Sequence, residues 1–171
     1  DDNPVLYFFH KGVMGLGWMT PNPRATGPVP VEPYTVPIGK ADVKRAGTDV
    51  TIVTLSLMVH RALDAADALA EKGIEAEVLD LRSLVPLDRE AIAESVRKTH
   101  RLLVVDEDYR SFGVSGEVMA VAVEEAFDYL DAPPARLAYP DVPVPYSRPL
   151  EQFCLPNADT IAAAASALVG R

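Results

Sequence analysis

The 171-residue sequence has a single cysteine, Cys154, and so can form neither an internal disulfide nor a thiolate metal cage. A lone thiol fits a reducing compartment, and we expect a cytoplasmic protein. The sequence also has no run of about 18 apolar residues, which excludes a membrane-spanning helix. Its first residues, Asp1 to Pro4, contain neither an initiator methionine nor a signal-peptide pattern. We therefore expect the chain to begin inside a longer protein.

Basic residues are scarce: 16 Lys and Arg stand against 25 Asp and Glu, for a formal net charge of −9. This balance disfavours nucleic acid and anionic membranes as main partners. The acidic excess is concentrated in residues 106–159, which hold 11 acidic and 3 basic residues. We therefore expect an acidic face for a basic partner. The hydrophobic fraction of 49% is otherwise ordinary for one globular domain.

Proline divides the chain into three parts. Prolines crowd residues 21–39 and are absent from residues 48–132 except for Pro86. Because proline fixes φ and lacks a backbone donor, we predict an extended linker over residues 21–39. Residues 40–171 then form the main domain, and residues 1–20 are the end of a preceding domain.

Two further segments lie outside the periodic part of the sequence. Prolines return in residues 133–156, which indicates a second extended arm. This arm is either a strap packed over the domain or a subunit contact, because Tyr146, Arg148 and Phe153 are residue types enriched at interfaces. The apolar segment Val5–Phe9 predicts a strand that has no neighbour in the main domain and belongs to the preceding one.

Strand-like and helix-like periods alternate along the main domain. Predicted strands cover residues 49–55, 74–81, 102–105 and 135–139, and predicted helices cover residues 59–71, 88–98, 118–130 and 158–169. We expect Gly73 to end the first helix and Asp88 to cap the second. Residues 41–46 are expected to pair antiparallel with the first strand through a turn at Gly47-Thr48. Because such alternation gives right-handed crossovers, the predicted fold is an α/β three-layer sandwich. Its sheet is five-stranded and mostly parallel, with one antiparallel edge strand.

The loop Phe112–Glu117 lies between a strand and a helix, where backbone amides at a helix N-terminus can bind phosphate. Its spacing matches neither the dinucleotide fingerprint nor the Walker pattern. A phosphate there would also meet the carboxylates of Asp106–Asp108 and Glu117. We therefore favour a tight strand-to-helix turn over a ligand site.

The acidic triplet Asp106–Asp108 could hold Mg²⁺ together with Asp80, which ends another strand. A phospho-acceptor domain of this kind would also need acidic residues after its first strand. That strand ends in Thr54-Leu55-Ser56, which disfavours the metal interpretation.

Three histidines, His10, His60 and His100, are candidates for acid–base or metal chemistry. None stands at ligand or triad spacing from a cysteine, a serine or another histidine. We interpret them as structural or surface histidines, while a triad assembled in space stays open at this point.

Several segments resemble, in order, the β subunit of the decarboxylating component of 2-oxo acid dehydrogenases, the thiamine-diphosphate enzymes for pyruvate, branched-chain 2-oxo acids and acetoin. The matching segments are Glu32–Ala41, Gly47–Thr54, Val78–Asp88, Val104–Asp108, Phe112–Glu117 and Val142–Ser147. The segment Val78–Asp88 alone is shared with transketolase and deoxyxylulose-phosphate synthase. The ending around Tyr146, Leu150-Glu151 and Leu155-Pro156 favours the dehydrogenase branch.

The resemblance implies a transketolase C-terminal-like domain at residues 40–171, preceded by the end of a pyrimidine-binding domain. In this family thiamine diphosphate and Mg²⁺ lie between the α subunit and the N-terminal domain of the β subunit. The activating glutamate and the catalytic histidine would precede Asp1, so we expect no catalytic and no cofactor-binding residue here and no activity of this fragment alone. The parent reaction would be oxidative decarboxylation with acyl transfer to lipoyl-lysine.

The resemblance also implies partners and two sets of site residues. The partners are a second β subunit, the α subunit of a heterotetramer, and the basic subunit-binding domain of the acyltransferase. Asp1 and Asn3 resemble the end of a potassium-binding loop. Asp131, Asp141 and Arg171 are candidates for acyltransferase docking.

The identity of the 2-oxo acid stays open, because residues 15–29 are longer and more apolar than expected of pyruvate enzymes. Two alternatives are also retained. One is the corresponding domain of transketolase or of deoxyxylulose-phosphate synthase, and we expect the latter enzyme to be a single long chain. The other is a stand-alone nucleotide- or phosphate-binding domain that uses the loop Gly113–Glu117.

Overall fold

The computed structural model describes residues 2–14 and 23–170. The chain divides into two compact units, Asp1–Thr35 and Val36–Arg171. In its described part, the first unit contains one short 3-10 helix, η1 (Pro23–Ala25). The second unit contains β1 (Asp42–Arg45), β2 (Val50–Thr54), α1 (Leu57–Ala70), β3 (Ala76–Asp80), α2 (Arg89–Thr99), β4 (Leu102–Tyr109), α3 (Val114–Ala126), the 3-10 helix η2 (Phe127–Tyr129), β5 (Ala135–Tyr139), α4 (Arg148–Cys154) and α5 (Ala158–Val169).

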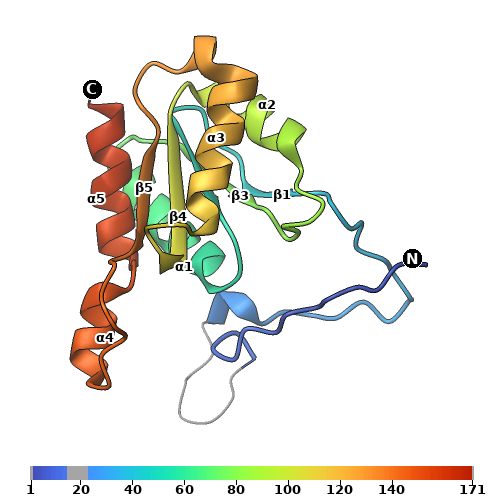
Figure 1. Ribbon diagram of the computed structural model, residues 1–171. Helices are drawn as coiled ribbons and strands as arrows, with labels where there is room; N and C mark the ends of the chain where they lie inside the picture. The colour runs from blue at the N-terminus through green and yellow to red at the C-terminus, as the bar shows by residue number, and fades with distance from the viewer. Residues whose placement is uncertain (1, 15–22, 171) are drawn as a thin grey trace. The chain divides into compact units, whose positions relative to one another are not determined.

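The second unit is a three-layer α/β sandwich around a five-stranded sheet of order β1-β3-β2-β4-β5 (Figure 1). Strands β3, β2, β4 and β5 are parallel, and β1 is antiparallel at one edge. Helices α1 and α5 cover one face, and α2 and α3 cover the other. The predicted fold class is therefore confirmed.

The partner predicted for the antiparallel edge strand is wrong, because β1 pairs with β3 and not with β2. The backbone N–H groups of Thr48 and Asp49 both donate to the Glu75 carbonyl, at 2.9 and 3.0 Å. The chain leaving β1 thus crosses the start of β3 before it enters β2. Residues 47–49 form this crossing and no hairpin turn.

Alternating residues of each strand point to the two helical layers, so each face has its own apolar core. On the α2 and α3 face, the side chains packed together are Val53, Leu79, Leu81, Ile92, Ala93, Val96, Leu102, Val104, Val118, Val121, Ala122 and Ala126. Burying one valine or leucine contributes about 1.5–3 kcal/mol. The sandwich is therefore a rigid base for the loops at the sheet edges.

Helix ends follow the local sequence. The Ala91 N–H donates to Asp88 Oδ1 at 3.3 Å, so the predicted cap of α2 is confirmed. The other oxygen of Asp88 accepts from the Ala41 N–H at 3.1 Å, which ties the start of the domain to α2. Gly73 has φ of 76°, a left-handed conformation that glycine adopts without steric cost, just after α1 ends.

Two predicted segments differ from the structure. Val5–Phe9 is exposed and has no strand conformation, because a strand needs a hydrogen-bonded neighbour and the described residues of the first unit supply none. The second proline-rich arm is not extended throughout, since it contains α4. Pro149 lies in the first turn of α4, where its missing N–H has no helical partner to lose. Among the described residues, no helix is long and apolar enough to cross a membrane.

Candidate functional site

The carboxyl ends of β2, β3 and β4 lie at the same end of the sheet, which we call the carboxyl edge. Each of these strands is followed by a residue with a left-handed backbone. These residues are Ser56, Arg82 and Phe112, with φ of 55°, 53° and 63°. This conformation costs a residue other than glycine roughly 1–2 kcal/mol. Strained residues gather at functional positions, and open α/β sheets bind their ligands at this edge. The carboxyl edge is therefore the candidate region for a functional site.

The acidic residues considered for Mg²⁺ are kept apart at this edge. Asp80 ends β3 and Asp106 lies in β4, but β2 separates these two strands, so their backbones are roughly 10 Å apart. Asp80 Oδ1 accepts from the Arg82 N–H at 3.1 Å, and burial raises the pKa of Asp80. Within the part of the chain that the structure describes, no three acidic, histidine or cysteine side chains form a metal site.

The start of α3 is built as a tight turn around Asp106. A Cβ on Gly113 would lie 2.3 Å from the Tyr109 carbonyl oxygen, so only glycine fits there. Burial raises the pKa of the Asp106 carboxyl, and the neighbouring backbone amides of Asp108, Glu107 and Ser115 partly offset this shift. The Asp106 carboxylate thus lies near the backbone amides at the start of α3, which would otherwise be available to bind a phosphate. This arrangement favours the turn over the phosphate site.

Two of the three histidines bind nearby backbone. His10 Nδ1 accepts from the N–H groups of Gly12 and Val13, at 3.1 and 3.3 Å. His100 ends α2 with φ of 61°, and its Nδ1 lies 2.8 Å from the Tyr129 carbonyl oxygen. These contacts support the structural interpretation for His10 and His100.

The loop after β4 is clamped by the end of β5. The Arg110 N–H donates to the Tyr139 carbonyl at 2.7 Å. Ser111 donates to Asp141 twice, from its backbone at 3.0 Å and from its hydroxyl at 2.6 Å, and these bonds lower the pKa of Asp141. Arg136 Nη1 donates to the Arg110 carbonyl at 2.9 Å. The loop that carries Phe112 is therefore held firmly.

Large apolar side chains project into solvent beside this loop and on α4. We call them the α4 surface: Phe112, Val144, Tyr146, Leu150 and Phe153. Phe112 and Tyr146 are exposed as fully as in an extended peptide, and Phe153 is 87% exposed. Tyr146 and Phe153 are predicted from the sequence as interface residue types. Phe112, Val144 and Leu150 are not, because nothing in the sequence indicates that these apolar residues are exposed.

Two tyrosines connect α4 with the sheet. The rings of Tyr109 and Tyr139 pack edge to face with centroids 5.5 Å apart. Burial and the neighbouring Cys154 thiol raise the pKa of the Tyr139 phenol to about 12. Cys154 is the last residue of α4, so the end of this helix lies beside β5. The α4 surface is thus attached to the carboxyl edge.

The predicted docking residues are not brought together. Asp131 precedes β5, where its N–H donates to the His100 carbonyl at 2.9 Å and its carboxylate lies 3.5 Å from Arg101. Asp141 follows β5 at the opposite edge of the sheet. Arg171 lies outside the described residues. Of the two residues considered for potassium, Asp1 also lies outside them, and Asn3 is an exposed residue of the first unit.

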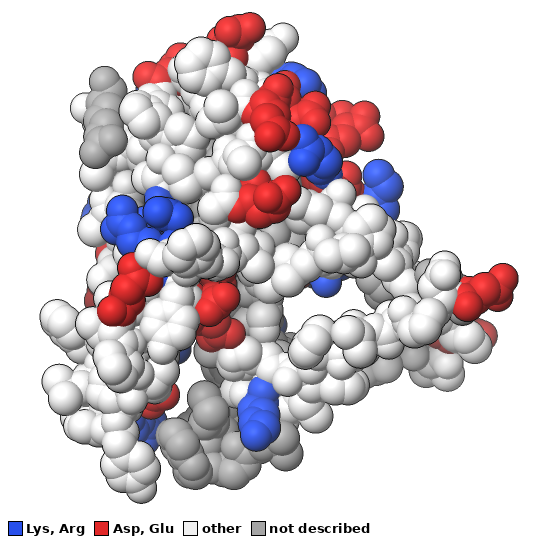
Figure 2. Space-filling model, viewed as in Figure 1, with Lys and Arg blue, Asp and Glu red and all other residues white. Residues whose placement is uncertain are grey.

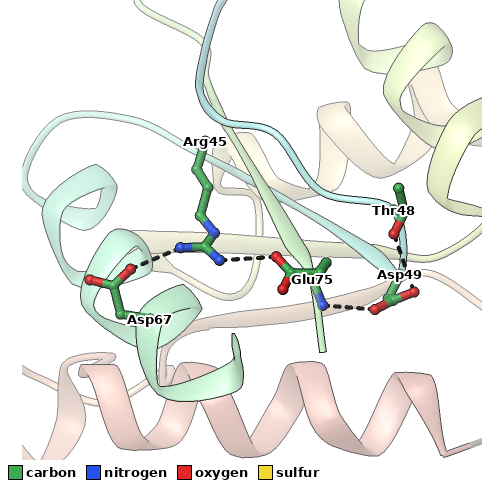
Figure 3. Close-up of polar contacts among 5 residues, drawn as sticks. All are labelled: Arg45, Thr48, Asp49, Asp67 and Glu75. Carbon is green, nitrogen blue, oxygen red and sulfur yellow. Dashed lines mark hydrogen bonds and ion pairs between the residues drawn. The ribbon is translucent and has the colours of Figure 1, made fainter. Parts of the chain in front are cut away.

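A further polar cluster at the amino edge was not predicted (Figure 3). Arg45 of β1 forms ion pairs with Asp67 of α1 at 2.9 Å and with Glu75 at 3.1 Å. Asp49 accepts from the Glu75 N–H at 2.7 Å. The cluster joins β1 and α1 to the crossing before β2, and its role is structural. Residues 22 to 30 positions apart form it, which no local sequence signal reveals.

Part of the acidic excess of residues 106–159 is paired with basic residues of other segments. On α3, Glu124 and Glu125 form ion pairs with Arg89 of α2, at 2.7 and 3.0 Å. Figure 2 shows acidic and basic side chains intermixed over α2 and α3. The charges of these two glutamates are thus partly balanced by a basic residue from another segment.

The transketolase C-terminal domain model matches residues 39–161. The chain therefore belongs to the transketolase C-terminal domain family. Within it, the chain is 45% identical to the β subunit of 2-oxoisovalerate dehydrogenase of Bacillus subtilis, over 96% of this chain and 48% of that protein. It is 55% identical to a mitochondrial pyruvate dehydrogenase E1 β subunit of Arabidopsis thaliana, over 75% of this chain and 35% of that protein. The resemblance to these β subunits is confirmed.

A solved structure described as a split-gene transketolase, an inactive β4 tetramer, has the same fold. It is 33% identical with a TM-score of 0.69 and covers 80% of this chain and 44% of that chain. The chain spans about half the length of the relatives it matches.

Proposed function

We propose that this chain is the C-terminal domain of the β subunit of a 2-oxo acid dehydrogenase, and that it serves subunit association and acyltransferase docking. The parent enzyme is an α/β heterotetramer that decarboxylates a 2-oxo acid oxidatively and transfers the acyl group to lipoyl-lysine. The observation that carries this proposal is the 45% identity to a 2-oxoisovalerate dehydrogenase β subunit over 96% of the chain. The uncovered α4 surface supports the association role.

Thiamine diphosphate and Mg²⁺ belong to the parent enzyme, and the described residues do not fit them. The α3 amides face the carboxylate of Asp106, which would repel a pyrophosphate. The acidic side chains at the carboxyl edge are separated by a strand. No step of the reaction is therefore assigned to these residues. A potassium site that includes Asp1 and Asn3 stays a proposal for the full β subunit.

The first unit belongs to the preceding pyrimidine-binding domain of the parent. Its apolar residues from Val5 to Phe9 are exposed here, and Leu6 and Phe8 are more than four-fifths exposed. Such a run would be covered by a neighbouring strand in a longer chain. We place the parent in the cytoplasm, since the single cysteine of this chain is free; the plant relative named above is mitochondrial.

The docking role is tested with a basic subunit-binding domain and single variants. Asp131→Asn should weaken binding about three- to tenfold and flatten its salt dependence, because an exposed carboxylate at a rim mainly contributes long-range attraction. Asp141→Asn is measured separately, since Asp141 lies at the other edge of the sheet. Glu71→Gln, which removes an exposed charge after α1, is the control. Affinity and salt slope are measured by titration calorimetry, and no difference between Asp131→Asn, Asp141→Asn and Glu71→Gln would exclude both aspartates.

The transketolase alternative has one observation in its favour, the split-gene relative. The dehydrogenase assignment is preferred because the identity is 45% to the dehydrogenase subunit and 33% to the split transketolase. Acyl transfer to a lipoyl domain by the full enzyme distinguishes the two, since a transketolase would transfer a two-carbon unit to an aldose instead.

A further inference from the structure

One serine and one aspartate join the segment after β4 to the segment after β5. The Ser111 hydroxyl donates to Asp141 Oδ2 at 2.6 Å, and the Ser111 backbone N–H donates to Oδ1 at 3.0 Å. We call these two bonds the loop clamp. Both residues are exposed, so a modifying enzyme can reach the Ser111 hydroxyl from solvent.

The surroundings of the Asp141 carboxylate favour negative charge. The hydrogen bond from the Ser111 hydroxyl lowers the pKa of Asp141 most, and the Ser111 backbone bond lowers it further. The positive charges of Arg110 and Arg136 act in the same direction. Arg136 Nη1 also donates to the Arg110 carbonyl at 2.9 Å, which keeps this guanidinium beside the loop that contains Ser111. The place occupied by the carboxylate is thus suited to an oxyanion.

A phosphoryl group on Ser111 would compete with Asp141 for this place. Its oxygens would extend from the hydroxyl oxygen that lies 2.6 Å from Asp141 Oδ2, so they would meet that carboxylate. A phosphoserine carries a charge of about −2 at pH 7 and is a stronger acceptor for arginine than a carboxylate is. We therefore expect the phosphate to take Arg110 and Arg136 as partners and to repel Asp141.

The loop clamp also fixes two segments that carry exposed apolar side chains. On the β4 side, the loop carries Phe112, and on the β5 side, residues 141–147 carry Val144 and Tyr146 and lead into α4. A charge change at the clamp therefore alters how these side chains are presented, because it acts on the bonds that position both segments.

We propose that Ser111 is a phosphorylation site, and that its phosphate displaces Asp141 and releases residues 141–147. The donor is a nucleoside triphosphate that a protein kinase uses. The hydroxyl oxygen of Ser111 forms the bond to the γ-phosphorus, the bond from that phosphorus to the bridging oxygen breaks, and nucleoside diphosphate leaves. The hydroxyl proton, which lies in the bond to Asp141, is released to water. This inference goes beyond the proposed function and is tested without it.

The first experiment incubates the 171-residue chain with ATP that carries a radioactive γ-phosphate, in an extract of the cells that produce the protein. The unaltered chain should be labelled, and Ser111→Ala should lose the label. Ser147→Ala is the matched control and should keep it, because Ser147 is an exposed serine beside an arginine whose hydroxyl does not cap α4. An unlabelled chain, or a label that Ser111→Ala retains, would overturn the inference.

The second experiment measures whether the arginines receive the phosphate. Phosphoserine is introduced at position 111 during translation, and phosphorus NMR follows the second pKa of its phosphate. This pKa should be lower in the folded chain than in the same chain unfolded in urea, where it should lie near the ordinary value of about 6. Arg110→Gln should move the folded value towards the urea value, and folding is retained because Arg110 is exposed. Equal values in the folded and unfolded chain would overturn the inference.

The third measurement is NMR relaxation of the backbone in the same phosphorylated chain. The order parameters of residues 141–147 should fall below about 0.6, the range of flexible backbone, while those of β5 stay near about 0.85. Ser111→Ala separates the phosphate from the loss of one bond. It keeps the backbone bond to Asp141 and should leave residues 141–147 ordered. Unchanged order parameters in the phosphorylated chain would overturn the release, and so would a loss of order that includes β5, because that would be unfolding.

Discussion

Asp106 shows what a single residue contributes at the carboxyl edge. Its side chain is 5% exposed, Oδ1 accepts from the Asp108 N–H at 3.1 Å, and Oδ2 has no hydrogen-bond partner within bonding geometry. Burial raises the pKa of this carboxyl above the ordinary value of 3.8. The charged form is therefore less favourable in the folded state than in the unfolded state. At neutral pH, the charged Asp106 carboxylate therefore lowers the stability of the folded state.

Asp106→Asn should raise the free energy of unfolding at pH 7 by about 1 kcal/mol, since the amide keeps the bond to Asp108 without a desolvated charge. In the unaltered chain, the folded state binds more protons than the unfolded state between pH 3.8 and its raised pKa. The free energy of unfolding of the unaltered chain thus increases as the pH falls through that interval. The difference in free energy of unfolding between the unaltered chain and Asp106→Asn becomes smaller.

Urea unfolding of both proteins at pH 7 and pH 4 measures this effect. Asp128→Asn, which removes an exposed charge on η2, should change the stability at neither pH. A variant with Asn at position 106 that is less stable than the unaltered chain at pH 7 would contradict the argument. It would mean that the backbone amides stabilise the carboxylate by more than burial destabilises it.

The crossing between β1 and β2 is the distinctive feature at the scale of elements. Gly47 passes over the start of β3, and a Cβ at this position would lie 2.3 Å from the Ala76 carbonyl carbon and from the Glu77 nitrogen. Both contacts are with backbone, which cannot rotate away. Glycine is therefore required for the route that brings β1 beside β3.

Gly47→Ala should lower the free energy of unfolding by about 2–3 kcal/mol, because either the crossing or the pairing of β1 with β3 must shift. Gly27→Ala is the matched control, since no atom lies within 4 Å of its added Cβ. Thermal unfolding of both variants measures the difference. Equal unfolding midpoints of Gly47→Ala and Gly27→Ala would contradict the argument, because they would show that a Cβ at position 47 is tolerated.

Most elements could be predicted because their signals are local. The cap at Asp88, the stop at Gly73 and the apolar runs of β2 and β3 each depend on neighbours within a few residues. Helix α4 was missed because prolines on both sides outweighed its short pattern. The neighbour of β1 was predicted incorrectly, because strand pairing depends on the route of the chain past Gly47 and not on the strand's own residues.

At the scale of the whole molecule, the chain spans about half the length of the relatives it matches. Its described residues contain no group of three acidic, histidine or cysteine side chains that could hold a metal ion. Titration calorimetry of the 171-residue chain with both ligands should give no binding heat up to about 1 mM. Inorganic pyrophosphate with Mg²⁺ is the companion titration, because it tests the α3 amides alone. Tight binding of the cofactor would contradict the assignment of its site to other segments.

Some properties of this protein follow from its sequence alone. The alternating periods, the caps and the ordered motifs were sufficient for the α/β sandwich and for its family, since these depend on local patterns. Only the tertiary structure decided which residues meet. It placed Asp131 and Asp141 at opposite ends of β5, paired Glu124, Glu125 and Asp131 with arginines, and left Phe112, Tyr146 and Phe153 exposed. Exposure and charge pairing depend on how distant segments pack, and the order of residues along the chain does not record this.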